Sequence, residues 1–145
     1  MSRAGYDTAI VGAGIVGLAL ARALLRRRSG LRLVVLEKEG AVAAHQTGHN
    51  SGVVHSGVYY RPGSLKARLS VAGARAMIEY CREHGLALAV PGKVIVAARE
   101  SERAGLREIE RRGGLNGVAG LRWLSSPELA ALEPAVRGVA ALHVP

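Results

Sequence analysis

A glycine-rich turn near the N-terminus constrains the fold more than any other feature of this chain. Residues 12–17 read GAGIVG, which matches the G-x-G-x-x-G fingerprint of dinucleotide-binding proteins. The apolar run at 6–11 predicts a buried strand before the turn, and the Ala- and Leu-rich run at 15–28 predicts a helix after it. In this setting Gly12 permits the tight turn, Gly14 lets the backbone approach phosphates, and Gly17 lets the helix pack closely on the strand.

A second strand and an acidic residue extend this pattern to residue 40. Residues 31–36 read LRLVVL, which predicts a strand covered on both faces, and Gly30 is expected to end the preceding helix. Strand, helix and strand in this order predict a parallel, Rossmann-like βαβ unit. Glu37 lies 20 residues after Gly17, where a carboxylate accepts hydrogen bonds from a ribose hydroxyl and repels a 2′-phosphate; it does not separate FAD from NAD. The predicted cofactor-binding residues of this segment are Gly12, Gly14, Ile15, Val16, Gly17, Glu37 and Lys38.

The segment from 41 to 63 is long, polar and rich in glycine, and a loop of this kind inside a domain is usually functional. Its centre, HQTGHNSGVVHSG, holds three histidines, but no Cys, Asp or Glu lies among them, and their spacing matches no common zinc site. No metal is therefore predicted. Hydroxyl, amide and imidazole groups can donate to a flavin ring or a phosphate, so a ligand-contacting loop is favoured over a plain surface loop. The predicted cofactor contacts are Thr47, His49, Asn50, Ser51 and Gly52.

The remainder, 64–145, predicts alternating helices and strands. Ser64 is expected to cap a helix that Gly85 ends, with one face formed by Leu65, Leu69, Ala72, Ala76 and Tyr80. Strands are expected at 86–90 and 93–98, around the Pro91-Gly92 turn, and a helix at 101–112 that Gly113-Gly114 ends. Residues 125–128, SSPE, predict a helix start, and 139–144 predict a strand. No later strand can pair with that last one, which indicates truncation.

Charge and composition narrow the range of partners. The net charge is +9, but the arginines are spread along predicted helices and only 3% of residues are aromatic, so no nucleic acid is predicted as a partner. Cys81 is the single cysteine, which excludes an internal disulfide and favours a reducing compartment, the cytoplasm. The apolar run at 9–25 is interrupted by glycines and followed, not preceded, by its positive charges, so it predicts neither a membrane span nor a signal peptide.

The fingerprint at 12–17, combined with HQTGHNSGVVHSGVYYRPGSLKA at 45–67, resembles the L-2-hydroxyglutarate oxidase/dehydrogenase family. That family belongs to the D-amino-acid-oxidase-like (DAO) group of FAD-dependent oxidoreductases. GKVIVA at 92–97, LSSPEL at 124–129 and EPAVRGVAALHVP at 133–145 fit the same family, so the resemblance covers essentially the whole chain. The resemblance shifts the expected cofactor from NAD to FAD.

The resemblance implies oxidation of L-2-hydroxyglutarate to 2-oxoglutarate by hydride transfer to the flavin. His55 is the best local candidate for the base that takes the hydroxyl proton; the alternative is a histidine that only donates a structural hydrogen bond. Arg61 and Lys66 could attract a 2-hydroxy dicarboxylate. Two other functions stay open. One is an oxidase of another small 2-hydroxy or 2-amino acid, and the other is a non-catalytic nucleotide-binding fragment that needs a partner chain.

Length is the departure from the family, because its members are far longer than 145 residues. We expect an incomplete α/β protein: a dinucleotide-binding βαβ unit at 1–40, a flavin-contacting loop at 41–63, and at 64–145 the start of a mixed α+β substrate domain. A complementing C-terminal chain is an expected partner, and the fragment alone is expected to be inactive. Peripheral contact with the inner face of a membrane is expected only if the electron acceptor is a quinone.

Overall fold

The computed structural model describes residues 5–145, which divide into two compact units, one ending at Gly52 and the other spanning Val53–Pro145. The division falls inside the long loop expected at 41–63, which contains no helix or strand. Over the described residues, no helix has both the length and the apolar character needed to cross a membrane. The two units are described one at a time below.

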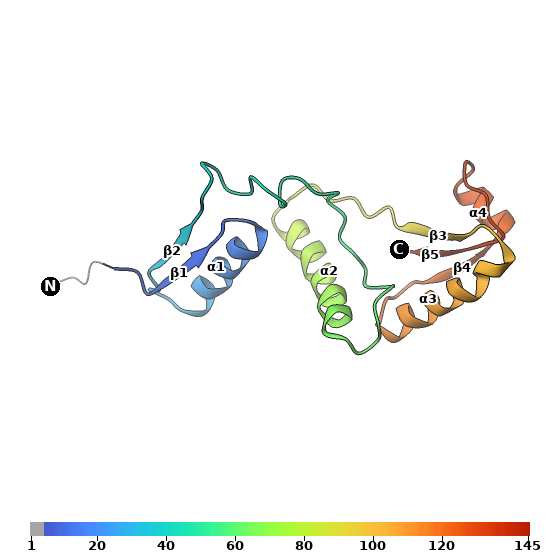
Figure 1. Ribbon diagram of the computed structural model, residues 1–145, viewed down its shortest axis with the longest axis horizontal. Coiled ribbons are helices and arrows are strands. Elements are labelled where there is room, and N and C mark those ends of the chain that lie inside the picture. The colour runs from blue at the N-terminus through green and yellow to red at the C-terminus, as the bar shows by residue number, and fades with distance from the viewer. Residues whose placement is uncertain (1–4) are drawn as a thin grey trace. The chain divides into compact units, whose positions relative to one another are not determined.

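The first unit is the predicted βαβ crossover. Strand β1 (Thr8–Val11) leads into helix α1 (Ile15–Arg27), which returns to strand β2 (Leu33–Leu36). The two strands are parallel, with Thr8 opposite Leu33 and Val11 opposite Leu36, and α1 lies beside them (Figure 1). Helix α1 forms because its Ala- and Leu-rich sequence has high helix propensity, and Gly30, at φ +75°, follows its end.

Polar contacts fix the two ends of the strand pair. At one end the Arg32 side chain and backbone N–H donate to the Asp7 carboxylate, with an Nη2–Oδ1 distance of 2.9 Å. At the other end the backbone N–H of Gly12 donates to the Leu36 carbonyl over 2.7 Å. The turn that carries the glycine fingerprint is therefore tied directly to the carboxyl end of β2.

The second unit begins with helix α2 (Leu65–Glu83), capped by Ser64, whose hydroxyl accepts from the Ala67 N–H. Its other elements are β3 (Lys93–Ala97), the short 3₁₀ helix η1 (Glu100–Glu102), α3 (Arg103–Leu115), β4 (Arg122–Ser125), α4 (Ser126–Leu132) and β5 (Ala140–Val144). The three strands form an antiparallel sheet in the order β3-β5-β4.

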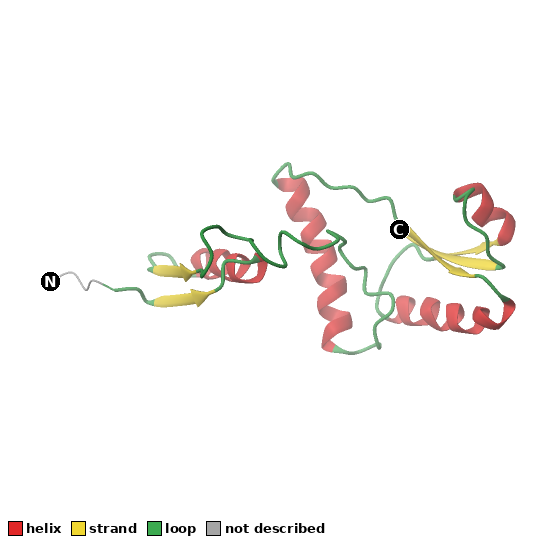
Figure 2. Ribbon diagram, turned by 45° about the horizontal axis from the view of Figure 1, so that its top comes forward, coloured by secondary structure: helices red, strands yellow, loops and turns green. Residues whose placement is uncertain are grey.

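The core of the second unit occupies both faces of this sheet. Leu142 and Val144 lie under α3 with Leu106 and Val58, whereas Ala141 faces α4 with Leu124 and Leu129. Figure 2 shows α3 and α4 against the three strands. Alternate residues of β5 point to opposite faces, so this strand is buried along most of its length.

The second unit differs from the prediction at three places. Residues 86–90 form no strand, and β3, which pairs with β5, does not pair with them. Gly113 and Gly114 do not end α3, which continues to Leu115. A β-carbon at Gly113 would lie 2.7 Å from Leu121 Cδ1 and 2.8 Å from Val58 Cγ2, so this glycine serves close packing. The sequence reading also missed strand β4, at 122–125.

The predicted apolar face of α2 does not face the core. Leu65 and Leu69 are more than 60% exposed, and the buried residue of the helix is Ala67. The strand at the end of the chain was expected to find no partner later in the sequence, and β5 is in fact the central strand, with both of its neighbours preceding it.

Candidate functional site

The glycine turn of the first unit has main-chain geometry that residues with a side chain rarely adopt. Gly12 has φ +100°, in the region that side chains disfavour. A β-carbon at Gly17 would lie 2.0 Å from the Gly12 carbonyl oxygen, so α1 can approach the turn only with glycine at this position. Both residues perform the roles predicted for them from the fingerprint.

The first turn of α1 presents backbone N–H groups without a side-chain cap of its own. Its N-cap is Gly14, and the first turn contains no acidic residue. Thr47 of the following loop reaches this turn, and its hydroxyl accepts from the Ile15 N–H over 3.0 Å. A helix N-terminus of this kind carries a partial positive charge and binds anions such as a pyrophosphate.

Glu37, directly after β2, is the acidic residue of the site. Its Oε2 accepts from the Ala13 N–H over 2.7 Å, and its Oε1 accepts from the N–H groups of Lys38 and Glu39. These hydrogen bonds, led by the one from Ala13, lower the pKa of the Glu37 carboxyl group. The residue is therefore ionised near neutral pH, and a carboxylate has about four lone-pair positions, so it can still accept from a ribose hydroxyl.

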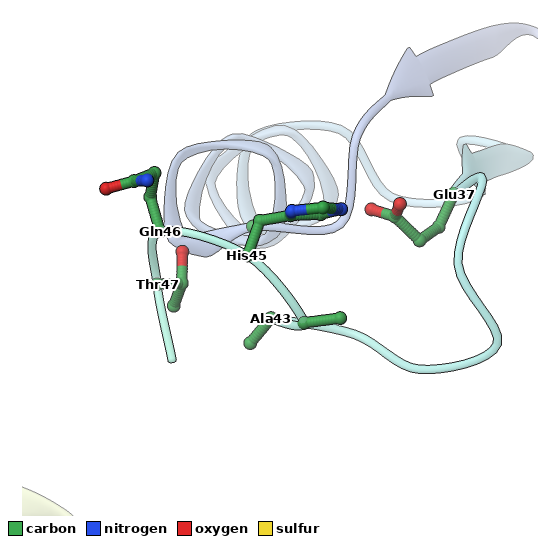
Figure 3. Close-up of a pocket in the computed structure, with 7 residues that line it drawn as sticks. Glu37, Ala43, His45, Gln46 and Thr47 are labelled. Carbon is green, nitrogen blue, oxygen red and sulfur yellow. The ribbon is translucent and has the colours of Figure 1, made fainter. Parts of the chain in front are cut away.

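A hollow of about 160 Å³ lies between Glu37 and the loop. In Figure 3 the Glu37 carboxylate and the His45 ring point toward each other beside the first turn of α1, with Thr47 on the far side of the hollow. His45 Nε2 lies 2.8 Å from Glu39 Oε1. The lining residues are Gly14, Glu37, Ala43, Ala44, His45, Gln46 and Thr47.

The loop is folded tightly on itself beside this hollow. The Asn50 amide donates to the carbonyls of Gln46 and Thr47, and its oxygen accepts from the Gly52 N–H. His49 Nδ1 contacts the His45 carbonyl over 3.0 Å. Asn50 and His49 thus hold the loop in shape, whereas Thr47 is the loop residue that contacts α1.

The other predicted cofactor residues lie at the border of the hollow or beyond it. The Val16 side chain, in the first turn of α1, is 79% exposed. The Lys38 ammonium forms an ion pair with Glu39 at 3.2 Å. Ser51 and Gly52 are exposed at the end of the first unit. None of these contacts tests cofactor binding, so the predicted set stays a prediction.

His55 belongs to the second unit and is exposed there, just before a firmly held turn at Gly57–Tyr60. Val58 of that turn is fully buried in the core. The Asn116 amide, after the end of α3, donates to the carbonyls of Gly57 and Tyr60 over 3.0 and 2.9 Å. The turn that follows His55 is therefore anchored to the core and to the end of α3.

Sequence reasoning missed the main-chain part of the site. The Ala13 N–H binds Glu37, the Ala13 carbonyl accepts from the Ala43 N–H, and a β-carbon at Gly48 would lie 2.7 Å from the Ala43 carbonyl. Backbone groups leave no signature in residue type, except the glycine itself. His45 and Gln46 were visible as part of the HQTGHNSG segment but were not among the predicted contacts.

The donors and acceptors of the first unit fit a dinucleotide. Gly14 lets Thr47 approach the start of α1, since a β-carbon at this position would lie 3.1 Å from Thr47 Oγ1. The N–H groups of the first turn of α1, which can bind a pyrophosphate, and the Glu37 carboxylate, which can accept from a ribose, thus lie on either side of the glycine turn. Among residues 5–145, no group of three or more His, Cys, Asp or Glu is arranged to hold a metal ion.

Curated relatives match nearly the whole chain. L-2-hydroxyglutarate dehydrogenase, mitochondrial, of Pongo abelii is 49% identical over 144 residues, which is 99% of this chain and 34% of that protein. L-2-hydroxyglutarate dehydrogenase of Indibacter alkaliphilus is 44% identical over 140 residues, which is 97% of this chain and 35% of that protein. The chain therefore spans about a third of the length of these relatives.

Solved structures of flavoenzyme type share the fold. Glycine oxidase from Geobacillus kaustophilus has a TM-score of 0.76 at 26% identity, over 97% of this chain and 39% of that one. L-proline dehydrogenase from P. horikoshii has a TM-score of 0.77 at 18% identity, which shows likeness of fold alone. The family model described as "DAO: FAD dependent oxidoreductase" matches residues 7–145. The chain, with its glycine turn, its Glu37 acceptor and its folded loop, is therefore a member of the DAO family of FAD-dependent oxidoreductases.

Proposed function

We propose that the first unit binds the ADP part of FAD. The observation that carries this proposal is that the α1 N-terminus, whose N-cap is Gly14, and the ionised Glu37 meet at the glycine turn. The N–H groups of the first turn of α1 would hold the pyrophosphate, and Glu37 would accept from the ribose hydroxyls. Thr47 would stay beside the phosphates, since its hydroxyl already contacts the Ile15 N–H.

We propose further that the complete enzyme oxidises L-2-hydroxyglutarate to 2-oxoglutarate. The names of the relatives with 44–49% identity support this substrate. Bound FAD would supply the two-electron acceptor. This chain would hold the cofactor and would supply His55, just before the turn at Gly57–Tyr60, as the base that takes the hydroxyl proton.

The substrate and the acceptor would require more polypeptide than these 145 residues, because the relatives are about three times as long. We infer that a further chain segment or a separate partner chain completes the enzyme. The first unit supports this inference: its sheet has two strands, and Val11, Val16 and Leu36 are more than half exposed beside the glycine turn.

A fusion protein tests the proposal. Residues 1–145 are joined to the part of the Indibacter alkaliphilus enzyme that follows its matched segment, and purified fusion protein and purified chain are compared. The fusion protein should carry a flavin absorbance spectrum and reduce an artificial electron acceptor with L-2-hydroxyglutarate, whereas the chain alone should be inactive. Glu37→Gln should weaken flavin retention, and Glu110→Gln, on α3 of the second unit, is the matched control.

Two results would contradict the proposal. A folded fusion protein without flavin would exclude the cofactor assignment. A yellow fusion protein that oxidises glycine or L-proline but not L-2-hydroxyglutarate would exclude the substrate and favour an amino-acid oxidase on the same scaffold.

A further inference from the structure

Two lysines of the second unit lie over consecutive tyrosine rings. Lys93, the first residue of β3, places its ammonium nitrogen 4.6 Å from the centre of the Tyr59 ring. Lys66, in the first turn of α2, lies 4.5 Å from the centre of the Tyr60 ring. Both tyrosines belong to the turn that accepts from Asn116, so each lysine, from a separate element, contacts a residue of that turn.

Lys93 is the more constrained of the two. Its in-register partner is Val144 of the central strand, whose side chain lies in the core under α3. Lys93 is half-buried, and burial lowers the pKa of its ammonium group. A half-buried cation loses part of its hydration, and a neighbouring anion normally offsets this loss.

No carboxylate among the described residues lies within ion-pairing distance of Lys93. The ion pairs of the second unit join arginines to glutamates on η1, α3 and α4, and none includes this lysine. The face of the Tyr59 ring stabilises the ammonium by a cation–π contact, which is weaker than a charge-assisted hydrogen bond to an anion. The Tyr59 hydroxyl is a further hydrogen-bond donor at this place.

We propose that Lys93 and Tyr59 bind the substrate carboxylate that is remote from the reacting carbon, and thereby select a dicarboxylate. This inference rests on the proposed function. The ammonium group would donate charge-assisted hydrogen bonds to that carboxylate, and the Tyr59 ring would keep Lys93 in place when no substrate is bound. Tyr59 is four residues from His55, so one short segment would carry both the base and part of the specificity site.

The first test uses the fusion holoenzyme and two substrates. L-2-hydroxyglutarate is compared with L-2-hydroxypentanoate, which has the same carbon chain but no remote carboxylate. Lys93→Gln should lower kcat/KM for L-2-hydroxyglutarate about 10- to 100-fold, the range expected for a lost charged hydrogen bond. It should leave kcat/KM for L-2-hydroxypentanoate nearly unchanged. Arg68→Gln, the same charge change on exposed α2, should change neither value.

The outcomes separate this inference from the function on which it rests. If the wild-type holoenzyme prefers the dicarboxylate and Lys93→Gln keeps the same preference, the specificity role of Lys93 is wrong and the function stands. If the wild-type holoenzyme oxidises neither substrate, the proposed function itself is wrong. An equal loss on both substrates would show a structural role and would also overturn the inference.

A second test needs no variant and no turnover. Acetylation of Lys93 in wild-type holoenzyme is followed by mass spectrometry with glutarate, with butyrate or with no added acid. Glutarate should slow the acetylation of Lys93 and leave that of Lys38, on the first unit, unchanged, whereas butyrate should have little effect. Lys93 that resists acetylation without any acid would be paired with a carboxylate of the remaining polypeptide, which would overturn the substrate assignment.

Discussion

Glu37 joins three parts of the first unit through a single carboxylate. It follows β2, accepts from the N–H of Ala13 in the glycine turn, and accepts from the two residues that begin the loop. The hydrogen bonds that orient it also keep it ionised. One side chain thus sets both the shape and the charge of the candidate ribose site.

A substitution at Gly17 tests whether α1 must approach the glycine turn closely. Gly17→Ala places a methyl group 2.0 Å from the Gly12 carbonyl oxygen, so the helix must shift. We expect the free energy of unfolding to fall by at least about 1–3 kcal/mol, measured by urea denaturation. Gly73→Ala is the control, since a β-carbon at this position in α2 meets no atom within 4 Å. It should raise stability by up to about 1 kcal/mol, and equal losses in both variants would contradict the close-approach argument.

The pair of Asp7 and Arg32 predicts a pH dependence. Hydrogen bonds from Arg32 lower the pKa of Asp7 from 3.8 to about 2. The folded state therefore binds fewer protons than the unfolded state between these values, so the stabilising effect is complete above about pH 4 and is lost as the pH falls toward 2. Asp7→Asn should flatten the stability curve in this window, and added salt should weaken the wild-type dependence. A curve unchanged by Asp7→Asn would mean that the pair contributes nothing.

The helices and strands that could be predicted are those whose formation depends on a short sequence motif within or beside them. The βαβ crossover follows from the glycine turn and two apolar strands. Helix α4 follows from SSPE, where the Ser125 N–H and hydroxyl both donate to the Glu128 carboxylate. Strand β4 and the unpaired run at 86–90 depend on which segments lie beside β5, and this pairing has no local signal. The candidate site divides in the same way: Glu37 and Thr47 were predictable from side chains, whereas the Ala13 and Ala43 backbone groups were not.

The side chain of Asn116, just after α3, makes two hydrogen bonds to the turn at Gly57–Tyr60, which gives an element-scale prediction. Asn116→Ala removes both amide hydrogen bonds and leaves the carbonyls of Gly57 and Tyr60 without these donors. Unfolding in urea should show a loss of about 1–3 kcal/mol. Hydrogen exchange at residues 57–60 should accelerate more than exchange in β5. Asn50→Ala in the other unit is the comparison, and it should leave exchange at 57–60 unchanged.

For the whole molecule, limited proteolysis should distinguish exposed loop segments from the packed sheet. Residues 48–55 and 85–91 are exposed throughout and contain neither helix nor strand. A protease of broad specificity should therefore make its first cuts in these two segments, identified by mass spectrometry. Stretch 93–144, which contains the sheet, should survive longer. Early cuts within β3, β4 or β5 would contradict the sheet as described.

The central place of β5 bears on how the chain folds while it is being synthesised. The ribosome releases β3 first and β4 next, and neither strand has its neighbour until β5 emerges. Strand β3 must then pair with β5, with Lys93 opposite Val144, although a long stretch of chain separates the two strands. Pairing between distant segments is slow to form, so during translation the nascent second unit exposes the apolar strands of its future core. The order of these strands therefore makes β3 and β4 natural targets for a chaperone that binds extended apolar segments.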